Sequence, residues 1–184
     1  MRKLIFPINV SLDGFADHTV AIADDELHDF FINYELNAVD AILFGRMTYQ
    51  LLQSYWPTAP KDPRATKSMI EFAHKINAIP KIVFSNTLSD VNWNNTKLVK
   101  ANAVEEVLKM KQGTGKNLSI GGISLAQTFM KQSLIDEYWI LVHPVIVGTG
   151  RRLFDGVNNK PDLKLMETKT FHSGVVVLHY KLNK

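Results

Sequence analysis

Short apolar runs alternate with segments whose apolar residues recur at helical spacing along most of the chain. The runs have the length and composition of buried strands. They predict strands over residues 3–10, 41–44, 81–84, 97–99, 118–120 and 138–147. Helical spacing between them predicts helices over residues 24–34, 48–53, 69–76, 102–108 and 125–129. This alternation of strands and helices is typical of an α/β fold with a mostly parallel sheet.

Two of the predicted helices begin with a capping residue. Asp24 precedes an apolar helical face made by Leu27, Phe30, Phe31 and Tyr34. Asn102 and Glu105 have the spacing of a capping box, with Asn in place of Ser or Thr. Both positions therefore predict where a helix begins.

The end of the chain has a different pattern. Residues 163–171 and 175–182 flank Ser173-Gly174, which predicts two strands joined as a hairpin. A length of 184 residues, without a repeat or an evident linker, fits one domain. We therefore expect residues 1–184 to form a single α/β domain, in which helices flank a mostly parallel sheet that ends in an antiparallel hairpin.

Composition excludes several function classes. The chain has no cysteine, which removes disulfides and thiolate chemistry, and its 6 histidines are scattered, so we expect no metal site. The net charge is +3, but Lys and Arg are spread along the chain, so we expect no nucleic-acid binding. No apolar run approaches the roughly 20 residues of a membrane helix. The first run is too short for a signal peptide, and we expect a cytoplasmic protein without a membrane partner.

Small or polar residues follow four of the predicted strands. The four junctions are Ser11-Leu12-Asp13-Gly14, Gly45-Arg46-Met47-Thr48, Ser85-Asn86-Thr87 and Gly121-Gly122-Ile123-Ser124. Ligands of open α/β sheets bind beyond the carboxyl ends of the strands, where such junctions meet. Two of the junctions open a helix, whose free N–H groups suit phosphate, and Arg46 adds a bidentate donor. The four junctions together predict a nucleotide-like ligand.

The same segments resemble a known family. The segments SLDGF (11–15), LFGRMTY (43–49), KIVFSNTL (81–88) and the long stretch 120–154, from IGGISLAQTF to GTGRRLF, are similar to the dihydrofolate reductase-like superfamily. Within it, the chain resembles the branch of the riboflavin-biosynthesis reductase domain, known as the C-terminal domain of the bifunctional deaminase-reductase. The resemblance covers nearly the whole chain.

The resemblance implies an NADPH-dependent oxidoreductase that reduces a small heterocyclic or carbonyl substrate. A pyrimidine of the riboflavin pathway, 5-amino-6-(5-phosphoribosylamino)uracil, and a pterin, as in dihydrofolate reductase, are the two models for that substrate. By similarity, Gly45, Arg46, Met47 and Thr48 would hold cofactor phosphates, and Ser85 and Asn86 would approach the adenosine 2′-phosphate. Gly121, Gly122, Ile123, Ser124 and Leu125 would wrap the pyrophosphate, and a cis peptide is expected between the two glycines.

Catalytic and substrate residues are less clearly indicated. Asp13 follows the first strand and either orients substrate and supplies a proton through water, or forms an ordinary Asp-Gly turn. Tyr49 and Trp56 either stack on a flat substrate or belong to the core. The acidic residues Asp24, Asp25, Glu26 and Asp29 crowd the first helix, but their spacing selects no proton donor.

Two expectations concern activity and assembly. Because a fold does not fix an activity, a non-catalytic nucleotide-binding protein on the same scaffold is the alternative to a reductase. Family resemblance also favours a homodimer. The apolar stretch Val175-Val176-Val177-Leu178 lies either in such an interface or in the core of the sheet.

Overall fold

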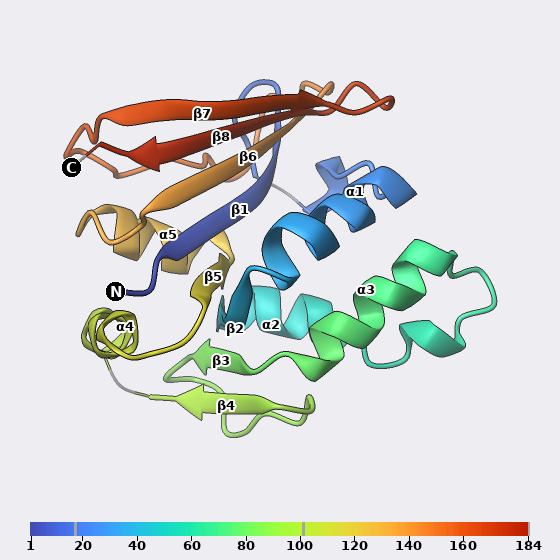
Figure 1. Cartoon of the computed structure of the whole chain (residues 1–184), viewed down its shortest axis with the longest axis horizontal. Helices are drawn as coiled ribbons and strands as arrows, with labels where there is room; N and C mark the ends of the chain where they lie inside the picture. Colours follow the sequence, from blue (N-terminus) through green and yellow to red (C-terminus); the bar gives the residue numbers. More distant parts are fainter. Residues whose placement is uncertain (17, 101, 184) are drawn as a thin grey trace.

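One eight-stranded sheet organises the described part of the chain, residues 1–16, 18–100 and 102–183 of a computed structural model (Figure 1). The strands are β1 (Leu4–Ser11), β2 (Val39–Gly45), β3 (Lys81–Phe84), β4 (Thr96–Val99), β5 (Asn117–Gly121), β6 (Glu137–His143), β7 (Leu163–Thr170) and β8 (Val176–Leu182). Their order across the sheet is β4-β3-β2-β5-β1-β6-β8-β7. The pairs from β4 to β6 are parallel, and β8 pairs antiparallel with both β6 and β7. The predicted mostly parallel sheet with a closing hairpin is confirmed.

Helices cover both faces of this sheet. The α-helices are α1 (Asp25–Phe30), α2 (Arg46–Gln53), α3 (Lys67–Ala78), α4 (Ala103–Gln112) and α5 (Ile123–Met130). Three short segments add to them: the 3-10 turns η1 (His18–Val20) and η3 (Ala59–Lys61), and the π-helical η2 (Phe31–Leu36), which continues α1 without a break. Figure 1 shows α1, α2 and α3 gathered in one part of the molecule and α4 and α5 in another.

Alternation along β1 divides the core into two layers. Leu4 and Phe6 pack with buried residues of α4 and α5, such as Val107 and Phe129. Ile5 points the other way and belongs to the cluster that includes buried residues of η2, α2 and α3. Successive side chains of a strand point to opposite faces, so β1 is apolar on both sides, as a central parallel strand requires.

The predicted helix starts are confirmed by their hydrogen bonds. The Asp24 carboxylate accepts a bond from the Leu27 N–H at 2.8 Å, and the Asn102 side chain accepts one from the Val104 N–H at 3.0 Å. These side chains satisfy N–H groups that the first helical turn leaves without partners.

The apolar stretch 175–178 near the carboxyl terminus contributes to a third hydrophobic cluster. Val175 and Val177 are 0% and 1% exposed and pack with Leu27, Phe30 and neighbouring residues. These two valines are therefore core residues rather than part of an exposed apolar surface.

The long strand predicted over residues 138–147 is shorter in the structure. β6 ends at His143, directly before Pro144, which has no N–H to donate to a neighbouring strand. Residues 145–147 instead belong to a loop, and the Val145 carbonyl of this loop accepts a bond from the Leu12 N–H at 2.8 Å.

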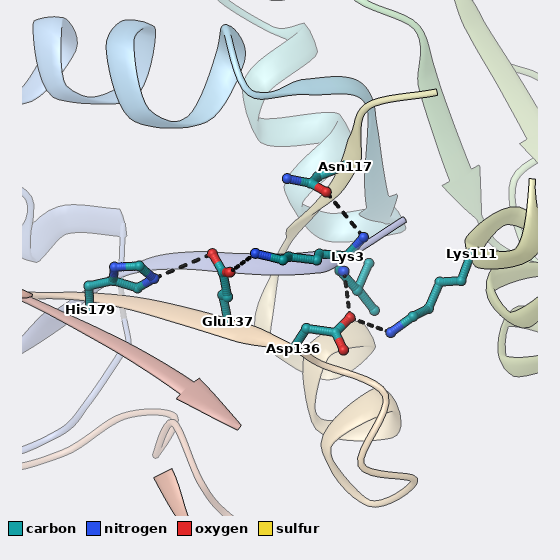
Figure 2. A network of polar contacts seen from close by, with 7 residues as sticks. Lys3, Lys111, Asn117, Asp136, Glu137 and His179 are labelled. Carbon is teal, nitrogen blue, oxygen red and sulfur yellow. Dashed lines mark hydrogen bonds and ion pairs between the residues drawn. The ribbon is translucent and has the colours of Figure 1, made fainter. Parts of the chain in front are cut away.

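Buried charges fix the amino ends of β1 and β6 (Figure 2). The Asp136 carboxylate accepts a bond from the Leu4 N–H at 2.8 Å and forms an ion pair with Lys111, whose side chain is 4% exposed. Beside it, Lys3 contacts Glu137 at 2.6 Å. This network lies at the end of the sheet opposite to the carboxyl-end junctions, so its role is to hold strands in place. Within the described residues, no helix has the length and apolar character needed to cross a bilayer.

Candidate functional site

Two neighbouring strands, β2 and β5, end beside each other and lead directly into α2 and α5. A pocket of about 440 Å³, the outer pocket, lies at this place. It is lined by Gly45, Arg46, Met47, Thr48, Phe84, Gly122, Ile123, Ser124, Leu125, Thr128 and Arg151. The structure thus brings together two of the four predicted junctions.

Both helices that start at the outer pocket lack a side-chain cap. Gly45 and Gly122 are the N-cap residues of α2 and α5, and neither helix start receives a side-chain hydrogen bond. The other α-helices of the described chain, α1, α3 and α4, are capped by Asp24, Thr66 and Asn102. The uncapped N–H groups and the positive ends of two helix dipoles therefore converge on one pocket, an arrangement suited to phosphate.

Two arginines complete the outer pocket. Arg46 is the first residue of α2, and Arg151 reaches in from the loop after β6. The Arg151 guanidinium donates to the Ser124 hydroxyl at 2.7 Å, which fixes it over the start of α5. Guanidinium groups bind phosphate oxygens in a bidentate manner, so the pocket has the charge and the donors for a polyanion. Arg151 was not among the residues predicted from the sequence.

The two glycines at the end of β5 allow a very close approach of backbone and side chains. A Cβ on Gly121 would clash with the Phe44 ring, and one on Gly122 would clash with the Thr48 hydroxyl. The peptide between them is trans, so the predicted cis bond is wrong. Gly122 instead has φ +109°, a backbone conformation that residues other than glycine rarely adopt. This conformation turns the chain into α5.

A second pocket, the inner cavity, adjoins the outer one and has a volume of about 320 Å³. Thr48 and Gly122 line both. Apolar and aromatic side chains dominate its wall, among them Ile8, Leu27, Phe31, Leu36, Phe44, Leu52, Trp56, Phe72 and Ile76. The polar side chains that line it are Asn9, His18, His28, Glu35 and Thr48.

Among the described residues that line the inner cavity, Glu35 is the acidic one. It lies in η2, and its carboxyl accepts a hydrogen bond from the hydroxyl of Ser119 on β5. Burial raises the pKa of Glu35 to about 7, and the Ser119 hydrogen bond only partly opposes this effect. A carboxyl with such a pKa holds a proton at neutral pH for a substantial part of the time and can act as an acid.

His28 lies on the same helical segment, seven residues before Glu35. Its side chain is buried, and burial is the main cause that lowers the pKa of its imidazole, so the ring is neutral at pH 7. The buried Nδ1 atom of His28 has no hydrogen-bond partner of normal geometry in the described structure. The Asp24 backbone still acts on the imidazole and partly opposes the lowering of its pKa. A neutral imidazole at the cavity wall offers a donor or an acceptor to a ligand.

The two predicted substrate residues have different positions. Trp56 lines the inner cavity. Tyr49 is 3% exposed and belongs to the core, and its hydroxyl accepts a bond from the Asn92 N–H at 3.1 Å. Tyr49 therefore belongs to the core cluster that also contains the cavity-lining residues Phe44 and Phe72.

The predicted residues Ser85, Asn86 and Asp13 lie outside the lining of both pockets. The Ser85 hydroxyl accepts a bond from the Leu88 N–H at 3.1 Å and forms a turn, although the preceding Phe84 does line the outer pocket. The Asp13 carboxylate accepts a bond from the Gly148 N–H at 2.8 Å. Asp13 thus connects the first junction to the loop after β6, which carries Arg151. Within the described residues, no group of three or more His, Asp or Glu side chains could hold a metal ion.

The family profile described as the RibD C-terminal domain matches residues 2–177. The chain belongs to this family. It is 35% identical over 185 residues to the uncharacterized protein YyaP of Bacillus subtilis, with 99% of this chain and 96% of YyaP covered. RibD is the bifunctional riboflavin-biosynthesis protein to which the sequence segments pointed, so the resemblance drawn from them is confirmed.

Solved structures confirm the dihydrofolate reductase-like fold. A putative riboflavin biosynthesis protein from Shewanella sp. PV-4 superposes with a TM-score of 0.76 at 22% identity, with 99% of each chain covered. The diaminohydroxyphosphoribosylaminopyrimidine deaminase/5-amino-6-(5-phosphoribosylamino)uracil reductase of Thermotoga maritima gives a TM-score of 0.63 at 18% identity. That match covers 99% of this chain and 57% of the longer Thermotoga chain.

Three residues of the site were missed by sequence reasoning: His28, Glu35 and Arg151. The acidic residues considered for the first helix all lay in its early turns, whereas Glu35 lies one turn beyond Phe31. The spacing of seven residues between His28 and Glu35 places both on one helical face, and this signal was available in the sequence. No sequence signal linked Arg151 to Ser124.

Proposed function

We propose that this protein is an NADPH-dependent reductase of a small heterocyclic or carbonyl substrate. The observation that carries the proposal is that the two pockets adjoin and share Thr48 and Gly122 as lining residues. A dinucleotide carries phosphates in its middle and a reactive ring at one end, so it fits a donor-rich pocket that opens into an apolar one. When bound, NADPH supplies a hydride.

The outer pocket has a defined role in this proposal. The uncapped starts of α2 and α5 and the guanidinium groups of Arg46 and Arg151 would bind the cofactor phosphates. The close contact of Gly122 with Thr48 would leave only a narrow connection for the nicotinamide end. Each exposed cation by itself adds little to the free energy of binding. For binding the cofactor phosphates, the converging backbone N–H groups would therefore be as important as the arginines.

The inner cavity supplies the proton and excludes water. Glu35 would give its carboxyl proton to the substrate atom that becomes basic as the substrate is reduced. The Ser119 hydroxyl holds the carboxyl in position, and the apolar wall keeps bulk water from competing. Family membership supports reductase chemistry, since the matched Thermotoga protein bears the name of a uracil reductase.

Binding of NADPH, measured by isothermal titration calorimetry, tests the first part of the proposal. We expect Arg46→Ala and Arg151→Ala each to weaken binding about tenfold, because each removes a charged donor from the phosphates. Arg64→Ala is the matched control, since Arg64 is exposed and pairs with Asp62 outside both pockets. Equal losses in all three variants would refute phosphate binding in the outer pocket.

Oxidation of NADPH at 340 nm, with a panel of pterins, pyrimidines and quinones, tests the second part. Turnover of at least one compound is expected. Tight NADPH binding without turnover of any compound would favour the alternative, a non-catalytic nucleotide-binding protein on the same scaffold.

A further inference from the structure

Four aromatic rings gather on one side of the inner cavity. Trp56 and Phe72 have ring centroids 4.5 Å apart, and the His28 ring lies 5.9 Å from Trp56 and 5.8 Å from Phe72. Phe31 extends the group, with its centroid 6.4 Å from Phe72. All four residues line the cavity. The packing of α1 on α3 brings His28 and Phe72 together, whereas Phe31 lies in η2 and Trp56 lies in the turn after α2. Such a wall offers flat, polarisable surfaces to a planar ligand.

The charge of the cavity is unusual for an enzyme of phosphorylated compounds. None of the described residues that line it is a lysine or an arginine. Its histidine at the aromatic wall, His28, is neutral at pH 7, and its acid, Glu35, is negative whenever it is ionised. The arginines of the site, Arg46 and Arg151, line the outer pocket instead.

Carboxylates also stand beside the aromatic wall. Asp24 caps α1 and Asp25 and Asp29 lie within it, all three close enough to His28 to act on its pKa. Asp24 follows Ala23, which lines the cavity. A phosphate held near this segment would meet negative charge without a compensating lysine or arginine among the described lining residues, which disfavours its binding.

We propose that the substrate reduced in the inner cavity is an uncharged, planar, conjugated ring without a phosphate group. This inference rests on the proposed function, because it assumes that the outer pocket holds the cofactor phosphates. It separates this protein from the Thermotoga reductase, whose name specifies a phosphoribosyl compound. A volume of about 320 Å³, near the lower limit for small-molecule pockets, also favours a small ring system, since the nicotinamide would occupy part of it.

The reaction balances with NADPH as the hydride donor and Glu35 as the proton donor. The nicotinamide would give a hydride, which is a proton with two electrons, to an electrophilic carbon of a C=N, C=O or conjugated C=C bond. The π bond breaks, and the Glu35 carboxyl gives its proton to the nitrogen, oxygen or carbon at the other end. The products are the reduced compound, NADP⁺ and the Glu35 carboxylate, which regains a proton from water.

Pairs of compounds that differ by one phosphate test the proposal. The first pair is 5-amino-6-(ribosylamino)uracil and its 5′-phosphate, and the second is 7,8-dihydroneopterin and its 3′-phosphate. In the first pair the hydride acceptor is the C=N bond of the ring-opened ribosylimine, which is conjugated with the uracil; in the second it is a C=N bond of the pterin ring. For each, kcat/KM is measured with saturating NADPH at pH 6.5, together with the Kd for NADPH. We expect the unphosphorylated member of at least one pair to be reduced with a kcat/KM at least tenfold above that of its phosphate.

The outcomes distinguish the two proposals. An equal or higher kcat/KM for the phosphorylated members would overturn the inference and leave the reductase intact. Failure of all four compounds, with normal NADPH binding, would also overturn the inference for these ring classes. Absence of NADPH binding would refute the proposed function itself.

The aromatic wall has its own test. We expect Trp56→Ala to lower kcat/KM for the preferred compound at least tenfold while the Kd for NADPH changes less than twofold. Trp56→Phe keeps an aromatic surface and should restore most of the lost activity. Equal activity of Trp56→Ala and the parent protein would show that the ring does not contact the substrate.

Discussion

Replacing Glu35 by Gln should stabilise the protein in alkaline solution while it removes the proposed acid. The carboxyl is held between η2 and β5, accepts a bond from Ser119, and has its pKa raised by burial from 4.5 to about 7. At 1.36 kcal/mol per pH unit, this difference corresponds to about 3 kcal/mol of unfavourable free energy for the folded, ionised protein. Glutamine has nearly the same shape, can keep a hydrogen bond to Ser119 and never ionises.

The effect has a definite pH dependence. Below pH 4.5 the carboxyl is protonated in both the folded and the unfolded chain, so ionisation costs nothing. Between 4.5 and about 7 the folded protein keeps the proton and the unfolded chain releases it, so the free energy of unfolding falls as the pH rises. Above about 7 the carboxyl is ionised in both states and the whole cost is present.

Urea unfolding at pH 5 and pH 8.5 measures this difference. We expect Glu35→Gln to raise the free energy of unfolding by roughly 2–3 kcal/mol at pH 8.5 and by much less at pH 5, with an unchanged m value. Glu71→Gln, at an exposed position of α3, is the matched control and should have a small, pH-independent effect. A Glu35→Gln effect that is equal at both pH values would refute the buried, proton-holding carboxyl.

Three further predictions concern the two pockets and the fold. Turnover by the parent protein should decline above pH 7, and Glu35→Gln should reduce kcat at least about a hundredfold, as shown by pH–rate profiles. Gly122→Ala should weaken NADPH binding at least tenfold, because a Cβ there closes the connection between the pockets. Gly148→Ala, also at positive φ but in open space, controls for backbone strain and should bind NADPH normally. Lys111→Met should lower the free energy of unfolding by about 3–5 kcal/mol, because it removes the ion-pair partner that Lys111 provides to the buried Asp136 carboxylate; a loss under 1 kcal/mol in urea titration would contradict this role.

Much of the architecture could be predicted from the sequence, because it depends on local patterns. Apolar runs mark the strands, and Asp24 and Asn102 mark helix starts by hydrogen bonds that span only two or three residues. The sequence also predicted that the junctions at Gly45 and Gly121-Gly122 lie at the same edge of the sheet, because parallel strands end there; that β2 and β5 are neighbours came from the structure.

The candidate site was predicted only in part. Side chains such as Ser85, Asp13 and Tyr49 have the right type for binding or catalysis, but Ser85 forms a local turn, and tertiary contacts place Asp13 in a loop connection and Tyr49 in the core. Sequence position does not reveal which partner a polar atom will find, so their roles could not be assigned from residue type.

The sequence alone determined the order of strands and helices and the placement of glycines and Arg46 where β2 and β5 end. Only the tertiary structure decided that Arg151 joins them, and that Glu35 and the aromatic rings of α1 and α3 enclose one cavity. The physical reason is that burial is a property of the packed chain. A glutamate in an exposed helix is an ordinary anion, and the same residue packed against β5 becomes an acid with a pKa of about 7.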